Sequence, residues 1–159
     1  MPRNYKSTAV LLRPDPKFNS LLATKIINKL MLSGKRSLAQ QIFYEAIDIA
    51  HKRLPDVQDA AEIFNRAIEN AKPMVEVRSK RVGGANYQVP VEVSRKRQQS
   101  LAFRWVLEVA RGTRRGRPFS VALAEELVAA WKREGGAYTK RENVHKMAEA
   151  NKAFSHFAW

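Results

Sequence analysis

One segment, residues 73–93, interrupts a chain whose apolar residues are otherwise spaced for helices. Apolar side chains occupy alternate positions on both sides of the pair Gly83-Gly84, with Val75 and Val77 before it and Tyr87, Val89, Val91 and Val93 after it. A period of two indicates β-strands, and paired glycines can adopt the positive φ of a tight hairpin turn. The segment is therefore predicted to be a two-stranded β-hairpin, and Pro90, which lacks a backbone donor, argues against a third strand.

The hairpin carries a cluster of cations, Arg78, Lys80 and Arg81, beside its glycine turn. An isolated two-stranded hairpin is marginally stable in water, so a partner surface or the body of the protein is expected to support it. Cations grouped in this way favour a phosphate backbone as the partner. For Tyr87 two interpretations stand: the ring stacks on a base, or it packs on a helix beneath the strand, which its three valine neighbours on the same face favour.

The rest of the chain is predicted to be helical because its apolar residues recur at spacings of three and four. About six helices are expected, in residues 19–32, 37–54, 57–72, 95–111 and 119–133, with the last opening at Thr139 and running through Val144, Met147 and Ala148. The predicted fold class is therefore mainly all-α, a bundle of about six helices with a two-stranded β-hairpin arm inserted between the third and fourth. A chain of 159 residues is expected to form a single domain, 1–159, with a basic N-terminal arm at 1–18 and the hairpin arm at 73–93.

Several residues are predicted to mark helix ends. Asp56 is the expected N-cap of the third helix, and Gly112 the expected end of the fourth. Gly135-Gly136 is expected to stop the fifth helix, and Thr139 with Glu142 has the spacing of a capping box that would open the sixth. Two tryptophans, Trp105 and Trp131, fall in apolar helical stripes and are interpreted as core residues rather than as stacking platforms.

The charge is large and unevenly distributed. The chain has 29 Lys plus Arg against 15 Asp plus Glu, a formal net charge of +14. Residues 1–40 hold eight basic and one acidic side chain, and residues 73–117 hold eleven and three, while the two remaining segments nearly cancel. Such a field favours a polyanion, and its placement indicates that the N-terminal region and the hairpin with the following helix bind it.

Few of the ingredients of catalysis are present. The chain has no cysteine, which excludes disulfides, a thiol nucleophile and thiolate zinc sites. Its three histidines match no zinc motif, and Gly34-Lys35 lacks the upstream glycine and following Ser or Thr of a phosphate loop. No apolar run approaches a membrane span, and no membrane partner is expected. The expectation is a protein that is not an enzyme and carries no cofactor or metal; an RNA-modifying enzyme would require a nucleophile or cofactor loop.

The basic elements suit folded RNA. The A-form deep groove does not admit a reading helix, so arms, ribbons and loops that lie on phosphates are the common means of recognition. No helix-turn-helix or zinc-finger signature is present. A helix N-terminus at Gly34–Ser37 could bind a phosphate or could be only a tight turn. The alternative reading is a DNA-architectural protein with a basic β-arm, which would usually dimerise to present two arms.

Four motifs resemble those of a known family. They are residues 75–93, VEVRSKRVGGANYQVPVEV; Asp15-Pro-Lys-Phe18; Leu30-Met31 before Gly34-Lys-Arg36; and residues 144–159, VHKMAEANKAFSHFAW. Together they closely resemble the bacterial and organellar form of the seventh small-subunit ribosomal protein. The resemblance covers nearly the whole chain in the same order.

The resemblance implies a structural protein of the small ribosomal subunit that acts in translation and ribosome assembly. It implies a primary binder of the 3′ major domain of the subunit's ribosomal RNA, which nucleates folding of the head, with its hairpin and C-terminal helix near the exit-site tRNA and the mRNA path. The implied partners are this RNA, other head and platform proteins, tRNA and mRNA. The implied setting is a monomer within a cytoplasmic or organellar ribosome.

The candidate contacts combine the charge map with the resemblance. The residues expected to bind ribosomal RNA are Arg3, Lys6, Lys17, Lys35, Arg36, Arg78, Lys80, Arg81, Arg95, Lys96, Arg97, Arg111, Arg114, Arg115 and Arg117. Those expected near tRNA or mRNA are Arg78, Lys80, Arg81, Lys140, Arg141 and Lys146. The loop 112–118 is richer in Arg and Gly than the family pattern, and residues 4–8 are less basic, which places their local RNA contacts in question.

Overall fold

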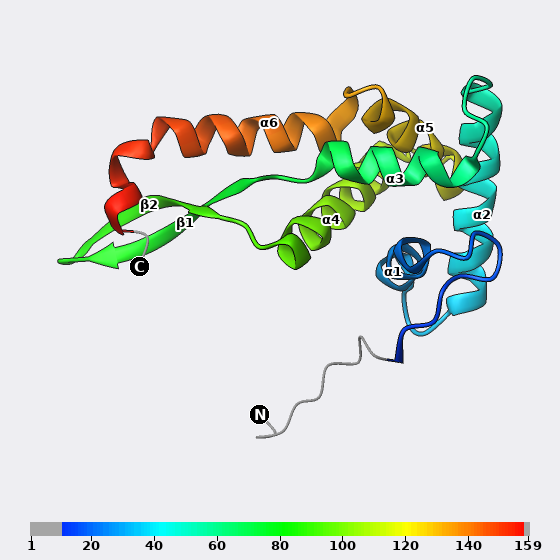
Figure 1. Cartoon of the computed structure of the whole chain (residues 1–159), viewed down its shortest axis with the longest axis horizontal. Coiled ribbons are helices and arrows are strands. Elements are labelled where there is room, and N and C mark those ends of the chain that lie inside the picture. The colour runs from blue at the N-terminus through cyan, green and yellow to red at the C-terminus, as the bar shows by residue number, and fades with distance from the viewer. Residues whose placement is uncertain (1–10, 158–159) are drawn as a thin grey trace.

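The computed structural model describes residues 11–157 and is mainly helical (Figure 1). Its elements, in chain order, are α1 (Leu21–Leu30), α2 (Arg36–Arg53), α3 (Ala60–Ala71), β1 (Val75–Val82), β2 (Ala85–Glu92), α4 (Arg95–Thr113), α5 (Phe119–Trp131), α6 (Gly135–Ala150) and the short 3-10 helix η2 (Lys152–Phe157). The hairpin lies between α3 and α4, so the predicted fold class is confirmed.

The core lies where α2, α3, α4 and α5 meet. Phe43 on α2 and Phe64 on α3 are fully buried, with ring centroids 5.6 Å apart in an edge-to-face arrangement. Phe18, which precedes α1, packs against both rings. Aromatic pairs of this geometry stabilise a core beyond their buried area. The segment before α1 is therefore attached to the helical body from Phe18 onward.

Asp15 fastens this segment to α2. Its side chain, 1% exposed, accepts hydrogen bonds from the backbone N–H groups of Lys17 and Phe18 and from the Tyr44 hydroxyl, the last at 2.7 Å. A buried carboxylate is tolerated because its oxygens are satisfied in this way. Residues 16–18 form a turn, and α1 begins only at Leu21.

The hairpin has the predicted two strands and the predicted glycine turn. The strands pair antiparallel from Val75 opposite Glu92 to Val82 opposite Ala85. Gly83 and Gly84 have φ of 57° and 90°, the positive values that a two-residue turn of this kind needs. The hairpin extends away from the helical body, with α6 and η2 running beside it (Figure 1).

Packing of Tyr87 confirms the second of its two interpretations. Its ring centroid lies 5.3 Å from that of Phe154 and 5.2 Å from that of Phe157, both on η2. The support that an isolated hairpin requires thus comes from the C-terminal part of the chain. The two tryptophans, Trp105 and Trp131, are half-buried against the core, as predicted.

Three helix ends differ from the predictions. The N-cap of α3 is Asp59, which accepts a 2.8 Å hydrogen bond from the N–H of Ala61, rather than Asp56. Burial of Leu54 and Val57 holds the intervening residues in a turn, which delays the helix. Helix α4 continues through Gly112 to Thr113, and α5 ends at Trp131.

The capping box predicted at Thr139 is wrong, because α6 begins at Gly135 and places Thr139 inside the helix. The Thr139 hydroxyl donates to the carbonyl of Gly135, 2.8 Å away. Gly135 has φ of 85°, and a Cβ at Gly136 would lie 2.6 Å from Cγ1 of Val109 on α4. The two glycines therefore let the chain turn sharply and let α6 lie close against α4.

Candidate nucleic-acid interface

Helices α2 and α4 both begin with positively charged residues. Lys35 is the N-cap of α2 and Arg36 its first residue, while α4 begins with Arg95, Lys96 and Arg97. Neither first turn has an acidic residue, and neither N-cap makes a side-chain capping hydrogen bond. Cations at this end oppose the helix dipole, whereas an anion there is stabilised by the dipole and by unpaired N–H groups. Both ends are therefore suited to phosphate.

A basic groove, defined here as three adjoining hollows, runs from between α1 and α4 to the turn that joins α1 to α2, and so connects these two helix ends. The first hollow, of about 440 Å³, is lined by Lys25 and Lys29 of α1 and Lys96 of α4. The second, of about 290 Å³, shares Lys29 and adds Arg104 and Arg111. The third, of about 330 Å³, shares Arg111 and ends at Lys35 and Arg114.

The groove brings together predicted residues from separate segments. Lys35, Lys96, Arg111 and Arg114 all line it. One carboxylate, that of Glu108, also lies in the second hollow, where it pairs with Lys140 at 2.9 Å. A row of cations between low-dielectric walls concentrates positive potential and attracts a polyanion.

Three cations that line the groove, Lys25, Lys29 and Arg104, were not predicted from the sequence as RNA contacts. Their signal was helical spacing: Lys25 and Lys29 are four residues apart, and Arg104 precedes Arg111 by seven. Residues at these spacings share one face of a helix. The spacing does not predict that the basic face of α1 lies opposite the basic face of α4.

Two predicted arginines, Arg78 and Arg97, are held by one buried carboxylate. Glu76 on β1 is 7% exposed and pairs with both, Arg97 lying at the start of α4. Burial raises the pKa of the Glu76 carboxyl, but hydrogen bonds from Arg97 and Arg78 outweigh it, so the pKa lies below the ordinary glutamate value. The Arg97 contact fixes the base of the hairpin to α4, whereas the Arg78 contact lies within β1.

The cations nearer the hairpin tip differ in their surroundings. Lys80 donates a 2.9 Å hydrogen bond from Nζ to the carbonyl of Phe157 on η2. Arg81, on the same strand, is exposed and forms no ion pair within residues 11–157. The tip therefore leaves Arg81 exposed to solvent, while Lys80 helps to hold η2 on the hairpin.

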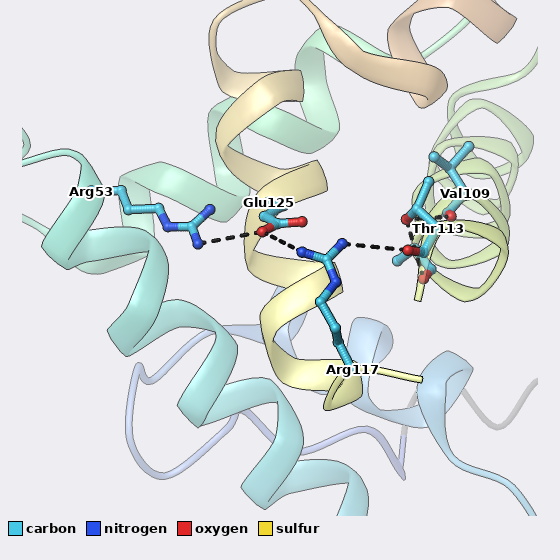
Figure 2. Close-up of polar contacts among 6 residues, drawn as sticks. Arg53, Val109, Thr113, Arg117 and Glu125 are labelled. Atoms are coloured by element: carbon cyan, nitrogen blue, oxygen red, sulfur yellow. Dashed lines mark hydrogen bonds and ion pairs between the residues drawn. The ribbon is translucent and has the colours of Figure 1, made fainter. Parts of the chain in front are cut away.

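The loop between α4 and α5 is organised by an ion-pair network (Figure 2). Glu125 on α5 accepts from Arg117, 2.9 Å away, and from Arg53 on α2, 3.4 Å away. Arg117 also donates to the carbonyl of Thr113 at the end of α4. The hydrogen bond from Arg117 lowers the pKa of the Glu125 carboxyl. Arg117 thus links helices, whereas Arg115 is exposed and makes no ion pair in the described residues.

The α6 cations do not all reach the hairpin. Lys140 pairs with Glu108 on α4, and Arg141 donates to the carbonyl of Asn70 at the end of α3, 2.7 Å away. Both therefore lie at the body end of α6. Lys146 lies farther along α6 and is exposed.

Three residues of the N-terminal segment were predicted to contact RNA. Arg3 and Lys6 lie outside the described residues. Lys17 pairs with Asp48 at 2.8 Å and lies over the rings of Phe18 and Tyr44, so its contacts are internal to the fold.

The described residues offer neither a metal cluster nor a membrane-spanning helix. Across 11–157, His, Asp and Glu side chains nowhere gather in a group of three that could hold a metal ion. Within the same range, no helix is both long and apolar enough to cross a bilayer.

A helical body, a β-hairpin arm and a groove lined by cations fit the class of RNA-binding components of ribonucleoproteins. Residues 2–152 match the family model described as "Ribosomal protein S7p/S5e". The chain belongs to this family and is a non-enzymatic, structural protein of the small ribosomal subunit.

Individual relatives are similar over nearly their whole length. The chain is 57% identical over 145 residues to "Small ribosomal subunit protein uS7" of Rhodopirellula baltica, covering 91% of the chain and 92% of that protein. It is 50% identical over 159 residues to the protein of the same name from Akkermansia muciniphila, covering 100% of each. For that of Fervidobacterium nodosum the identity is 49% over 157 residues, 99% of each.

Proposed function

We propose that the chain is a primary binder of the 3′ major domain of small-subunit ribosomal RNA and that it nucleates folding of the head of the subunit. The observation that carries the proposal is the basic groove, which joins two helix ends suited to phosphate. An early binder must hold RNA segments that are distant in sequence, and a long groove with cations at both ends can do this by contact with phosphates.

The hairpin and α6 are proposed to lie near the exit-site tRNA and the mRNA path. Their parallel arrangement away from the body supports this, because it leaves Arg81 and Lys146 exposed beyond the groove. Lys80, Lys140 and Arg141 are assigned a second role: they hold the hairpin and α6 in place through contacts within the protein. Arg78 pairs with Glu76 on its own strand.

The proposal is tested by the affinity of the full-length protein for a transcript of the 3′ major domain, measured beside duplex DNA at matched ionic strength. Specific binding of the transcript with a steep salt dependence is expected, because each neutralised phosphate releases counterions. The double substitution Lys29→Ala and Arg104→Ala should weaken this binding and reduce the salt slope by about two. Equal affinity for the DNA would contradict the proposal and favour the architectural alternative.

The matched control is Lys52→Ala with Lys132→Ala, which removes the same charge from exposed positions that line none of the three hollows. Its affinity should stay close to that of the wild type. A loss equal to that of the groove variant would show that total charge alone determines binding.

A further inference from the structure

The third hollow of the basic groove combines apolar walls with a cationic rim. It lies between the turn that joins α1 to α2 and the junction of α4 with α5. Its walls include Met31, Leu38, Ile42 and Phe119, and its volume is about 330 Å³. Pockets that bind small organic groups begin at about this size and are mostly apolar with a few polar groups at defined positions.

Two leucines at this hollow are exposed. Leu32, in the turn, is 67% exposed, and Leu38, in the first turns of α2, is 49% exposed. Single exposed leucines are common on protein surfaces, but two that line one concave site leave an apolar patch uncovered. A ligand that fills this hollow needs an apolar face to cover these side chains.

The rim defines the charge of that occupant. Lys35, Arg111 and Arg114 line the hollow, and no acidic side chain does. Lys35 and Arg111 form no ion pair among the residues that the structure describes, and Arg114 donates only to the backbone carbonyl of Arg117. The rim therefore has uncompensated positive charge on two sides of an apolar cavity. A group with a flat apolar centre and negative charge on either side complements it.

We propose that the hollow receives one unpaired base of the bound RNA, unstacked from its neighbours. The flanking phosphates then lie on Lys35 from one side and on Arg111 and Arg114 from the other. An RNA occupant is favoured over a peptide because the hollow continues the groove through Arg111. Sequence-specific RNA recognition commonly uses bases splayed from loops and bulges into such sites. The inference rests on the proposed binding of ribosomal RNA and names one nucleotide contact within it.

The test compares two equally exposed leucines in the full-length protein. Leu38 is 49% exposed and lines the hollow, whereas Leu21 is 50% exposed and lines none of the three hollows. Leu38→Ser should lower affinity for the 3′ major domain transcript roughly fivefold or more, with an unchanged salt slope, because a base contact is lost and no phosphate contact is. Leu21→Ser should bind like the wild type.

Lys35→Ala tests the phosphate contact, as Leu38→Ser tests the base contact. It should lower affinity and also reduce the salt slope by about one, because a phosphate contact is lost. Unchanged circular dichroism and melting temperature for all three variants would show that the fold is intact.

Chemical probing of the transcript locates the base. In the wild-type complex, one unpaired base should be protected at its Watson–Crick edge; with Leu38→Ser the same base should become reactive while sugar protection along the groove stays. Equal affinity and equal base reactivity for the Leu38 and Leu21 variants would overturn the inference. So would a Leu38 variant that binds RNA normally but fails to recruit a neighbouring head protein, which would assign the hollow to a protein segment. Failure of the wild type to bind the transcript would instead overturn the proposed function, and the inference with it.

Discussion

The carboxylate of Glu76 on β1 lies 2.7 Å from Nε of Arg97 in the first turn of α4. This contact joins the arm of the molecule to its body at the point where the chain leaves the hairpin. It also occupies an arginine that the sequence indicates as an RNA contact. The attachment of the hairpin base therefore depends on the charge of a carboxylate that is only 7% exposed.

Glu76→Gln should destabilise the protein by about 1–2 kcal/mol, because a charge-assisted hydrogen bond becomes a neutral one while both arginines remain half-exposed. The measurement is urea unfolding with linear extrapolation. The control is Glu92→Gln, an exposed glutamate on the paired strand. An equally large effect at Glu92 would show that net charge, rather than the contact with Arg97, explains the loss.

The contribution of Glu76 to the stability of the fold should depend on pH. Its pKa is lower in the folded protein than in the unfolded chain, so the carboxylate contributes stability above the ordinary glutamate pKa. That contribution is lost as the pH falls through the lower, folded value. The stability difference between wild type and Glu76→Gln should therefore be full near neutrality and shrink in acid. A difference that stayed constant from pH 7 into the acid range would contradict the assigned ion pair.

The hydroxyl of Tyr44 should ionise at a higher pH than that of an ordinary tyrosine. Burial, then the hydrogen bond to Asp15 and the charge of that carboxylate, raises the pKa of Tyr44 from 10.0 to about 12. In an alkaline titration followed by ultraviolet absorbance, the difference between wild type and Tyr44→Phe should rise near pH 12. Because the folded state holds this proton more tightly than the unfolded chain, stability should fall as the pH rises from about 10 to 12. Tyr44→Phe should remove that part of the fall; a difference signal near pH 10 would place the hydroxyl in solvent.

Arg115 and Arg117 should separate binding from stability. Arg117→Ala removes the contacts to Glu125 and Thr113 shown in Figure 2, and should lower stability by up to about 1 kcal/mol, the range of partly exposed ion pairs. Arg115→Ala should leave stability within about 0.5 kcal/mol and reduce RNA affinity and the salt slope. Thermal unfolding and RNA titration of both variants provide the check. The reverse pattern would mean that the loop adopts another arrangement.

Local features of the fold were predictable because their causes are local. Alternation of valines with polar residues and the positive φ available to Gly83-Gly84 determine the hairpin within a few residues. Apolar residues at spacings of three and four located the six helices. The capping box at Thr139 failed because the start of α6 is determined by the approach of Gly136 to Val109, a residue 27 positions earlier on another helix.

The candidate site was only half predictable for a related reason. The excess of cations and their segments are properties of the sequence, and the cations that they single out lie at the starts of α2 and α4. The groove arises from the way α1, the start of α2 and α4 come together, and no pattern within one segment of the sequence predicts that arrangement. The same holds for Arg97, whose partner Glu76 is 21 residues away.

Alanine at two glycines should have opposite effects. At Gly136 a Cβ would lie 2.6 Å from Cγ1 of Val109, so α6 would have to move away from α4, and a loss of about 1–3 kcal/mol is expected. At Gly112, inside α4, a Cβ would have no neighbour within 4 Å, and Gly112→Ala should raise stability by up to about 1 kcal/mol because alanine restricts the unfolded chain and favours helix. Melting temperatures of the two variants give the comparison directly. If Gly136→Ala were neutral, α4 and α6 could not lie as close as described, and the position of the hairpin, which depends on α6, would have to be revised.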